Sequence, residues 1–539
     1  MKLKQLLALT AAFILQTSIA QETGLIISPE FVIASDVTDG DSDIANPGKP
    51  GIGFDGENYL VVTCREGDAT DNIFGVLLSP EGDILLSFLI DDVGHPTYAP
   101  CSDQKPAVAF DGDNYLVVFT RVTGSGSRNV IGTRVTPSGT VLDGPGGFTI
   151  FEYAFEAAVA FNGSNYLVVS DRYSRDTLQD IIGVNVTPAG EVLEEFPIFT
   201  ASGGQVFPSV AFDGTNYFVV WSDTRSGSPV GPDADIYGAR VSSVGVVLDP
   251  QGIPISTAPG IQEYPVVIFD GNNYFAVWED TRSNPDVFPP ALDIYGTRIT
   301  PNGVVLDGPT DSGGIAINTN AIPQQHPAVS FNGVEYLVTW DASIFYDPPV
   351  GIYVARVSTD GVLLDGPPDA EGILVSQPTC FSCKHVWPNI LFSGNNFLLG
   401  WSSNTEMSGA GKDIVGVLIS SPSDEKEVAI DIKPDKNSDN VISLKKGKNL
   451  KVAIVGNVEF DSLQVNPATI RFGPEGASPI RYKGRDYNHD GYYDLILTFK
   501  LAETGIACGD ADATLTGETF PDPVISITGT DSFTVEPCP

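Results

Sequence analysis

One short phrase, Phe-Asp-Gly-x-Asn-Tyr or a near copy of it, constrains the fold of this chain more than any other feature. It occurs seven times, and successive copies start 51 to 62 residues apart. The copies begin at Phe54, Phe110, Phe161, Phe212, Phe269, Phe331 and Phe392. A repeat of this length is one supersecondary unit that buries its apolar side chains against neighbouring units. We therefore expect an array of similar units.

The fourth repeat shows what one unit contains. Residues 208–212 and 217–221 are short apolar segments joined by Asp-Gly-Thr-Asn, and residues 236–242, 246–248 and 253–256 follow them. Asp, Asn and Gly tolerate the positive φ of tight hairpin turns, and short runs of Val, Ile, Phe and Tyr between turns indicate strands. Each repeat therefore predicts about four antiparallel strands, the content of one β-propeller blade.

The two ends of the repeat array complement each other. The seventh repeat ends after residues 414–420 without an outer strand, whereas residues 31–35 match such a strand and have no repeat of their own. Joining them would close a ring and remove exposed sheet edges. The sequence thus predicts an all-β fold, with a seven-bladed β-propeller over residues 21–421 closed by an N-terminal strand. An open β-solenoid is the alternative.

The first twenty residues predict a secretory signal peptide. Lys2 and Lys4 precede an apolar stretch over residues 6–15, and Ser18-x-Ala20 is a small-residue cleavage site. The apolar stretch is too short to span a bilayer, and no later stretch predicts a transmembrane segment. We expect a protein that is secreted or at the cell surface, extracellular or periplasmic.

The chain is strongly acidic, with 68 Asp and Glu against 29 Lys and Arg and a net charge of −39. Such a field repels nucleic acid and anionic membranes and favours divalent cations. Nucleic acid is therefore not expected as a partner.

Six cysteines form an even set, as expected of disulfides in an exported protein. Cys64 ends the second strand of repeat one, and Cys101 precedes the first strand of repeat two, so both are expected at one rim. Fifteen pairings are possible in principle. The favoured set is Cys64–Cys101, Cys380–Cys383 and Cys508–Cys538.

The composition changes near Ser421. Residues 21–421 hold four lysines, and residues 422–539 hold nine. Apolar stretches of strand length recur after this point, at residues 428–432, 450–455, 469–472, 494–499 and 524–527. We expect a small C-terminal β-sandwich over residues 424–539.

A loop of this C-terminal unit has the spacing of a calcium site. Its oxygen ligands would be the side chains of positions one, three, five and nine and one carbonyl, with Gly491 permitting the bend. The predicted ligands are Asp486, Asn488, Asp490, the carbonyl of Tyr492, and Asp494. Leu497 stands where an EF-hand needs Glu, so the loop would be a shorter, structural calcium site. The alternative is an acidic hairpin without an ion.

The residue before the first strand of each repeat varies, although packing positions usually repeat. In a propeller the innermost strand begins beside the central channel, so these residues would surround one of its mouths. A funnel of aromatic, imidazole and charged side chains suits a sugar-like ligand. The alternative is a solvated rim without a ligand. The predicted ligand-binding residues are Lys49, Lys105, Glu156, Phe207, Tyr264, His326 and Trp387.

Two other repeated features predict packing. Trp221, Trp278, Trp340 and Trp401 occupy one equivalent position at the end of the second strand and are expected in the core. The Asp-x-Arg pairs that follow two of them, Asp223/Arg225 and Asp280/Arg282, predict ion pairs that fix loops.

The repeat cores, Phe-Asp-Gly-x-Asn-Tyr-Leu-Val-Val-Trp and Asp-Ile-Tyr-Gly-x-Arg-Val, resemble the propeller repeats of bacterial secreted and surface proteins. Residues 428–538 are similar to a module that ends many bacterial extracellular proteins. That resemblance rests on Ala429-Ile-Asp-Ile-Lys-Pro434, Val465-x-Pro-Ala-Thr-Ile-Arg-Phe-Gly473, the loop at Asp486, and Thr504-Gly-Ile-x-Cys508. Neither resemblance implies a catalytic residue.

Three functional interpretations follow. The first is an exported, non-enzymatic protein that recognises a polysaccharide or a cell-surface protein through the propeller mouth, with a calcium-braced C-terminal module. The alternative is a polysaccharide lyase or glycoside hydrolase acting in the same funnel. The third is a structural component of an envelope or matrix. The chain contains no Gly-x-Ser-x-Gly or His-Glu-x-x-His motif, and no catalytic residue is assigned.

Overall fold

The chain divides into two compact units, residues 1–420 and 421–539. The computed structural model describes residues 25–35, 49–65, 71–95, 105–122, 127–174, 178–225, 233–283, 292–342, 351–378, 384–404, 412–420, 426–434, 440–444, 449–457, 460–520 and 526–536. The predicted signal peptide lies outside these residues.

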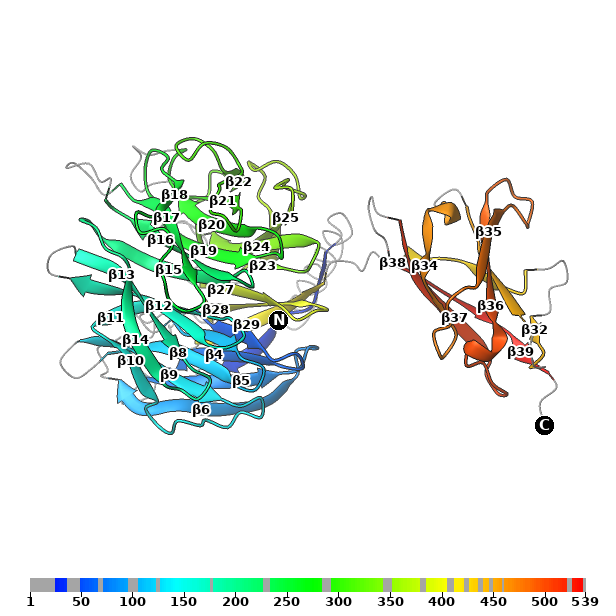
Figure 1. Cartoon of the computed structure of the whole chain (residues 1–539), viewed down its shortest axis with the longest axis horizontal. Coiled ribbons are helices and arrows are strands. Elements are labelled where there is room, and N and C mark those ends of the chain that lie inside the picture. Colours follow the sequence, from blue (N-terminus) through cyan, green and yellow to red (C-terminus); the bar gives the residue numbers. More distant parts are fainter. Residues whose placement is uncertain are drawn as a thin grey trace, which may run out of the picture. The chain divides into compact units, whose positions relative to one another are not determined.

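The first unit is all-β, and each repeat forms one antiparallel sheet in which sequential strands are neighbours (Figure 1). The first four sheets are β3–β6 (Gly51–Phe54, Tyr59–Arg65, Asp71–Leu78, Ile84–His95), β7–β10 (Ala107–Phe110, Tyr115–Val122, Arg128–Val135, Phe148–Glu152), β11–β14 (Ala154–Phe161, Tyr166–Ser174, Leu178–Val186, Val192–Phe199) and β15–β18 (Gln205–Phe212, Asn216–Asp223, Asp235–Ser242, Ile253–Ser256). The others are β19–β22 (Gln262–Phe269, Tyr274–Asp280, Asp293–Ile299, Ile315–Asn318), β23–β26 (Gln324–Phe331, Glu335–Ala342, Ile352–Ser358, Ile373–Ser376) and β27–β29 (Lys384–Phe392, Phe397–Asn404, Lys412–Ser420).

The N-terminal segment completes the sheet of the last repeat. β1 (Ile26–Ile27) and β2 (Phe31–Ser35) both pair antiparallel with β29, and Phe31 lies opposite Gly416. This pairing of residues 31–35 is the one expected from the sequence. It gives the last repeat the outer strand that its own residues lack.

The seven sheets form a closed ring. The first strands of consecutive repeats contact each other in order, and β27 of the last repeat contacts β3 of the first. Hydrogen bonds between described residues cross this junction. The side-chain amide of Asn389 donates to the carbonyl of Pro50 at 2.8 Å, and the Tyr59 hydroxyl donates to the carbonyl of Asn396 at 3.0 Å. The first strands therefore surround one central axis.

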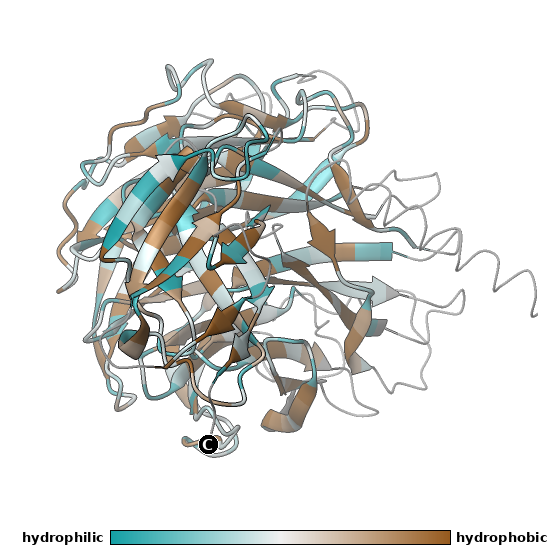
Figure 2. Ribbon diagram, turned by 90° about the vertical axis from the view of Figure 1, so that its right-hand side faces the viewer, coloured by the Kyte–Doolittle hydropathy of each residue, from teal (hydrophilic) through white to brown (hydrophobic). Residues whose placement is uncertain are grey.

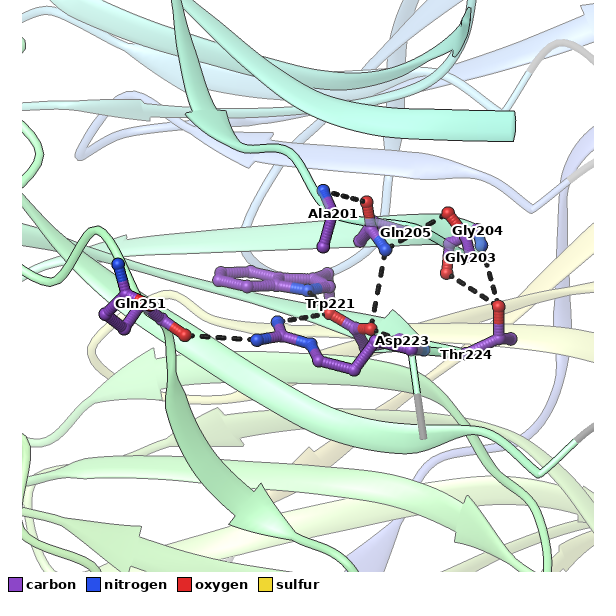
Figure 3. Close-up of polar contacts among 9 residues, drawn as sticks. Ala201, Gly203, Gly204, Gln205, Trp221, Asp223, Thr224 and Gln251 are labelled. Carbon is purple, nitrogen blue, oxygen red and sulfur yellow. Dashed lines mark hydrogen bonds and ion pairs between the residues drawn. The ribbon is translucent and has the colours of Figure 1, made fainter. Parts of the chain in front are cut away.

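The four repeated tryptophans are fully buried, which confirms their expected role in the core. Figure 3 shows how Trp221 is held: its indole N–H donates to Asp223 Oδ2 at 2.8 Å. Arg225 pairs with the same carboxylate and donates to the carbonyl of Gln251 at 3.0 Å. The Asp-x-Arg motif therefore fixes a loop, as expected. Asp280 and Arg282 repeat the arrangement around Trp278.

One predicted strand is absent from the fourth repeat. Residues 246–248 do not form a ladder strand, and they make only an isolated bridge between Val241 and Val247. The outer strand of this sheet is β18, and Asp249 of the intervening turn pairs with Arg240 of β17 at 2.9 Å. The turn is thus held by an ion pair instead of a ladder.

The second unit contains two four-stranded sheets. One has the order β30–β38–β37–β34 (Lys426–Glu427, Ser526–Ser532, Asp512–Thr519, Val465–Phe472), and the other has the order β31–β33–β36–β35 (Ile430–Ile432, Asn449–Ile454, Asp494–Lys500, Arg481–Arg485). β32 (Val441–Ile442) pairs with β39 (Thr534–Val535), and short 3-10 helices span Ser462–Gln464 and Leu501–Glu503. Side chains of both sheets share one core, which includes Ile432, Ile470, Leu497 and Leu515.

Hydrophobic residues recur along the strands throughout the chain (Figure 2). No helix of the described residues has the length and apolar character needed to cross a membrane.

The described part of the chain includes two of the six cysteines. Cys64 in β4 is buried, and neither Cys64 nor Cys508 is a free thiol. Cys101, Cys380, Cys383 and Cys538 lie outside the described residues. The three pairings therefore stay predictions.

Candidate functional site

All seven residues predicted at the mouth line a single cavity of about 240 Å³ at one end of the innermost strands. The seven are Lys49, Lys105, Glu156, Phe207, Tyr264, His326 and Trp387. Each comes from a different repeat, so the ring brings together positions that are far apart in the sequence. Prolines that follow the mouth residues also line the cavity, among them Pro106, Pro208 and Pro265.

The position of these residues relative to their strands differs from the prediction. Lys49 and Lys105 precede β3 and β7 as expected, but the other five lie inside their strands. The strand register shifts at each of these five sites, for example between Val206 and Ser209 around Phe207. In repeats four to seven the mouth residue is followed by a proline, which has no N–H to donate to the neighbouring strand. Strand pairing therefore stops at this proline and resumes on the N-terminal side of the mouth residue.

Four of the mouth residues have a backbone conformation that bulky side chains rarely adopt. The φ angles are 57° for Phe207, 54° for Tyr264, 55° for His326 and 59° for Trp387. A left-handed conformation of a non-glycine residue costs about 1–3 kcal/mol and persists only where the surroundings impose it. Such strain concentrates at binding sites, and here the bulge turns each aromatic side chain toward the cavity.

The ammonium group of Lys105 lies in the middle of the mouth. Its Nζ atom is 2.6 Å from Glu156 Oε1, and it is 4.7 Å from the ring centre of Trp387. The ring centres of Tyr264 and Phe207 are 5.3 Å and 5.5 Å from the same atom. Lys105 therefore contacts four other repeats at once, through one ion pair and three cation–π contacts.

The aromatic side chains form two stacked pairs around Lys105. The ring centres of Phe207 and Tyr264 are 4.1 Å apart, and those of His326 and Trp387 are 3.4 Å apart. Tyr264 meets the second pair edge-on, at 6.0 Å from His326. The cavity thus has a continuous aromatic wall on one side and the Lys105–Glu156 pair within it.

A group of buried acids supports the mouth residues from behind. Asp171 Oδ1 accepts the backbone N–H of Glu156 at 3.0 Å, and Glu279 Oε1 accepts that of His326 at 2.6 Å. Asp341 Oδ1 accepts the backbone N–H of Trp387 at 3.0 Å and lies 2.7 Å from Nδ1 of His326. These acids hold the bulges and orient the imidazole.

Sequence reasoning missed these three acids, although a signal for them existed. Each occupies the position directly after the end of the repeated Tyr-Leu-Val-Val-Trp segment, where the seven repeats carry Cys, Thr, Asp, Ser, Glu, Asp and Ser. This position varies as the mouth residues do. Comparing it across repeats would have identified the acids as part of the same site.

Burial changes the proton affinity of several of these groups. It raises the pKa of Asp171 to about 7, with a further contribution from the charge of Glu156. Burial also raises the pKa of Glu279 to about 7, and the neighbouring His326 opposes that shift. Burial together with the positive charge of Lys105 lowers the pKa of Lys49 to about 8. The site therefore combines acids and a base that exchange protons near neutral pH.

The loop predicted to bind calcium lies in the second unit. Asp494 is fully buried, and its two carboxylate oxygens accept the backbone N–H groups of Gly456 and Tyr487 at 3.0 Å and 2.9 Å. Asp486 and Asp490 also accept backbone N–H groups of the loop. Within the described residues no three His, Cys, Asp or Glu side chains converge to hold a metal ion. In this conformation the acids brace the hairpin directly.

No known protein family matches the chain, and no curated protein matches it. Among solved structures, it is similar to an α-L-arabinanase of Penicillium chrysogenum complexed with arabinobiose, with a TM-score of 0.39, 10% identity, and coverage of 73% of this chain and 98% of that one. It is also similar to an arabinanase of Bacillus subtilis, with a TM-score of 0.32, 12% identity, and coverage of 58% and 92%. A third is the β-propeller domain of the Trilobed protease from Pyrococcus furiosus, with a TM-score of 0.39, 10% identity, and coverage of 70% and 94%.

The first functional interpretation, a non-enzymatic binding protein, is corrected by this comparison. The similar structures include several glycoside hydrolases, among them the two arabinanases. At these identities and TM-scores the similar structures assign no residue role to this chain.

Proposed function

We propose that the protein is an exported enzyme that cleaves a glycan at the mouth of its ring, as a glycoside hydrolase or a polysaccharide lyase. The ring is taken as a seven-bladed β-propeller closed by its N-terminal strand, and the second unit as a β-sandwich. The seven sheets around one axis and the shared core of the two C-terminal sheets support this description.

The Lys105–Glu156 pair, enclosed by an aromatic wall, is the observation that carries the proposal. Aromatic faces pack against the apolar faces of sugar rings, and convergent polar groups fix their orientation. Cleavage by hydrolysis or by elimination needs an acid or base near the bond and a group that stabilises developing charge. Glu156 and His326 supply a carboxyl and an imidazole group at the cavity, and Lys105 supplies an ammonium group.

His326 has the support expected of a catalytic base. Its Nδ1 atom lies 2.7 Å from the fully buried Asp341, and its ring stacks on Trp387. A buried carboxylate at one ring nitrogen fixes the orientation of an imidazole and leaves the other nitrogen for a ligand. We assign His326 and Glu156 as the proton-transferring groups.

Release of new reducing ends from a panel of neutral and acidic polysaccharides tests the proposal, because hydrolysis and elimination both produce them. Ultraviolet absorbance of an unsaturated product distinguishes elimination. Glu156→Gln and His326→Ala are each expected to lower the rate at least about 100-fold. The control is Glu194→Gln, at an exposed position of strand β14. Absence of cleavage by the unaltered protein, or full activity of both variants, would contradict the proposal.

Calcium binding by residues 486–494 is a separate proposal. It is supported by the spacing of the oxygen side chains and by the tight bend at His489 and Gly491, whose φ angles are 65° and 96°. Binding would require the carboxylates of Asp486 and Asp490 to turn from backbone N–H groups toward the ion. Titration calorimetry with calcium should give a signal that Asp490→Asn abolishes and that Asp512→Asn, at an exposed position of β37, retains. Equal heats for Asp490→Asn and the unaltered protein would contradict it.

A further inference from the structure

The distribution of lysines points to the charge of the ligand. Residues 21–421 contain only four lysines, Lys49, Lys105, Lys384 and Lys412. Two of them, Lys49 and Lys105, line the one mouth cavity. In a chain with a net charge of −39, two cations side by side at the mouth are a marked local exception. Like charges in one partly buried site repel each other and lose hydration, so their convergence needs a compensating partner.

The acid at the mouth compensates for only part of this positive charge. An ammonium group has three N–H donors, and among the described residues Glu156 accepts one from Lys105. Only Lys105 and Glu156 act as charged groups on Lys49 within that part of the chain. Two lysines against one glutamate leave an excess of one positive charge at the cavity. The aromatic rings around Lys105 favour the cation but offer it no hydrogen-bond acceptor.

The buried acids behind the mouth do not remove this excess. Asp171 and Glu279 are not among the residues that line the cavity. Burial holds the pKa of each at about 7, so near neutral pH each carries a full negative charge only part of the time. Asp341 is occupied by His326 and by the backbone of Trp387. Of these acids and Glu156, only Glu156 lines the cavity, where it faces two lysines.

We propose that the mouth recognises an anionic sugar residue, whose carboxylate or sulfate group binds Lys105 and Lys49 while its ring packs on the aromatic wall. This inference rests on the proposed function and names the substrate class for the same site. The acidic surface of the protein repels polyanions over long distances, so binding depends on this local cation pair.

Binding of matched oligosaccharides tests the inference. The probes are a galacturonate oligomer, its methyl ester, a sulfated galactan oligomer and a neutral galactan oligomer, each titrated by calorimetry. The ester keeps the sugar chain and removes the charge. A charge-assisted hydrogen bond corresponds to about a tenfold to hundredfold change in affinity, so one charged probe should bind at least about tenfold more tightly than the uncharged probes. Comparison of the carboxylated and sulfated probes identifies the anionic group.

Variants of matched lysines complete the test. Lys105→Gln should remove the preference for the charged probe, whereas Lys384→Gln, at the exposed start of β27, should retain it. Thermal unfolding of both variants checks that the ring is intact. Equal binding of charged and uncharged probes would overturn the inference. Cleavage of only the neutral polymer would also overturn the inference, although the proposed enzymatic function would stand. Charge-dependent binding without cleavage of any polymer would support recognition of an anionic sugar and contradict the proposed enzymatic function.

Discussion

The two ends of the innermost strands are built on opposite principles. At the turn end the repeats share one design, which the fourth repeat illustrates. Asp213 Oδ1 accepts the backbone N–H groups of Thr215 and Asn216, both at 2.7 Å, and so fixes the hairpin turn. The Tyr217 ring is fully buried against Phe212, and its hydroxyl donates to the carbonyl of Asn165 in the preceding repeat at 3.0 Å.

At the mouth end the side chain varies from repeat to repeat, and four of these residues are held in a left-handed conformation that favours glycine. The turn end therefore shows what each unit needs in order to pack against the next. The mouth end contains side chains that the ring holds in a strained backbone conformation, which lowers the stability of the fold. Repetition within one chain thus separates residues that build the fold from residues that line the mouth cavity.

Tyr217→Ala is the change expected to have the largest effect. Removing a fully buried aromatic side chain should lower the free energy of unfolding by about 3–5 kcal/mol. Denaturant titration followed by tryptophan fluorescence measures it, because all five tryptophans belong to the first unit.

Phe207→Gly is the matched change at the mouth. It removes the stacking on Tyr264 but also relieves the positive φ of 57°. These effects oppose each other, so the free energy of unfolding should change by less than about 1 kcal/mol. If Phe207→Gly destabilised the ring as much as Tyr217→Ala, the distinction between the two ends would fail.

The turn end and the set of mouth residues could both be predicted from the sequence. The turn residues repeat from unit to unit, and the mouth residues stand out because they do not. The strand register at the mouth could not be predicted, because a bulge leaves no periodic pattern in the sequence. Pro208, for example, looks like the first residue of a strand. Strand β37 (Asp512–Thr519) was missed because its Thr-rich sequence contains only two apolar side chains, Ala513 and Leu515. The buried acids were missed because a charged residue after an apolar strand reads as the beginning of a loop.

Glu279→Gln tests the support behind the mouth. Burial raises the pKa of Glu279 from 4.5 to about 7, so the folded protein retains a proton that the unfolded chain releases. The stability associated with this proton is fully present below pH about 4.5 and is lost as the pH rises through about 7. Glutamine keeps an acceptor for the His326 N–H without a buried charge. At pH 8 the variant should therefore be more stable than the unaltered protein by on the order of 2 kcal/mol.

At pH 4 the same two proteins should have nearly equal stability, since the carboxyl group is then mostly protonated in both folded and unfolded chains. Denaturant titrations at both pH values measure the difference. Glu194→Gln, at an exposed position of β14, is the control and should give the same small difference at each pH. A constant difference for Glu279→Gln across this range would show that its carboxylate is not desolvated.

The smallest expected effects concern one exception at the turn end. The hydroxyl of Tyr336 donates to the Asp270 carboxylate, whereas that of Tyr217 donates to a backbone carbonyl. Tyr217→Phe should cost about 1 kcal/mol, and Tyr336→Phe should cost up to about twice as much because its acceptor is charged. A double-mutant cycle with Asp270→Asn isolates the pair, and a coupling energy near zero would reduce Tyr336 to a packing residue. A positive coupling energy would show that the turn end tolerates a different hydrogen-bond acceptor for the tyrosine hydroxyl, provided that the hydroxyl still links consecutive repeats.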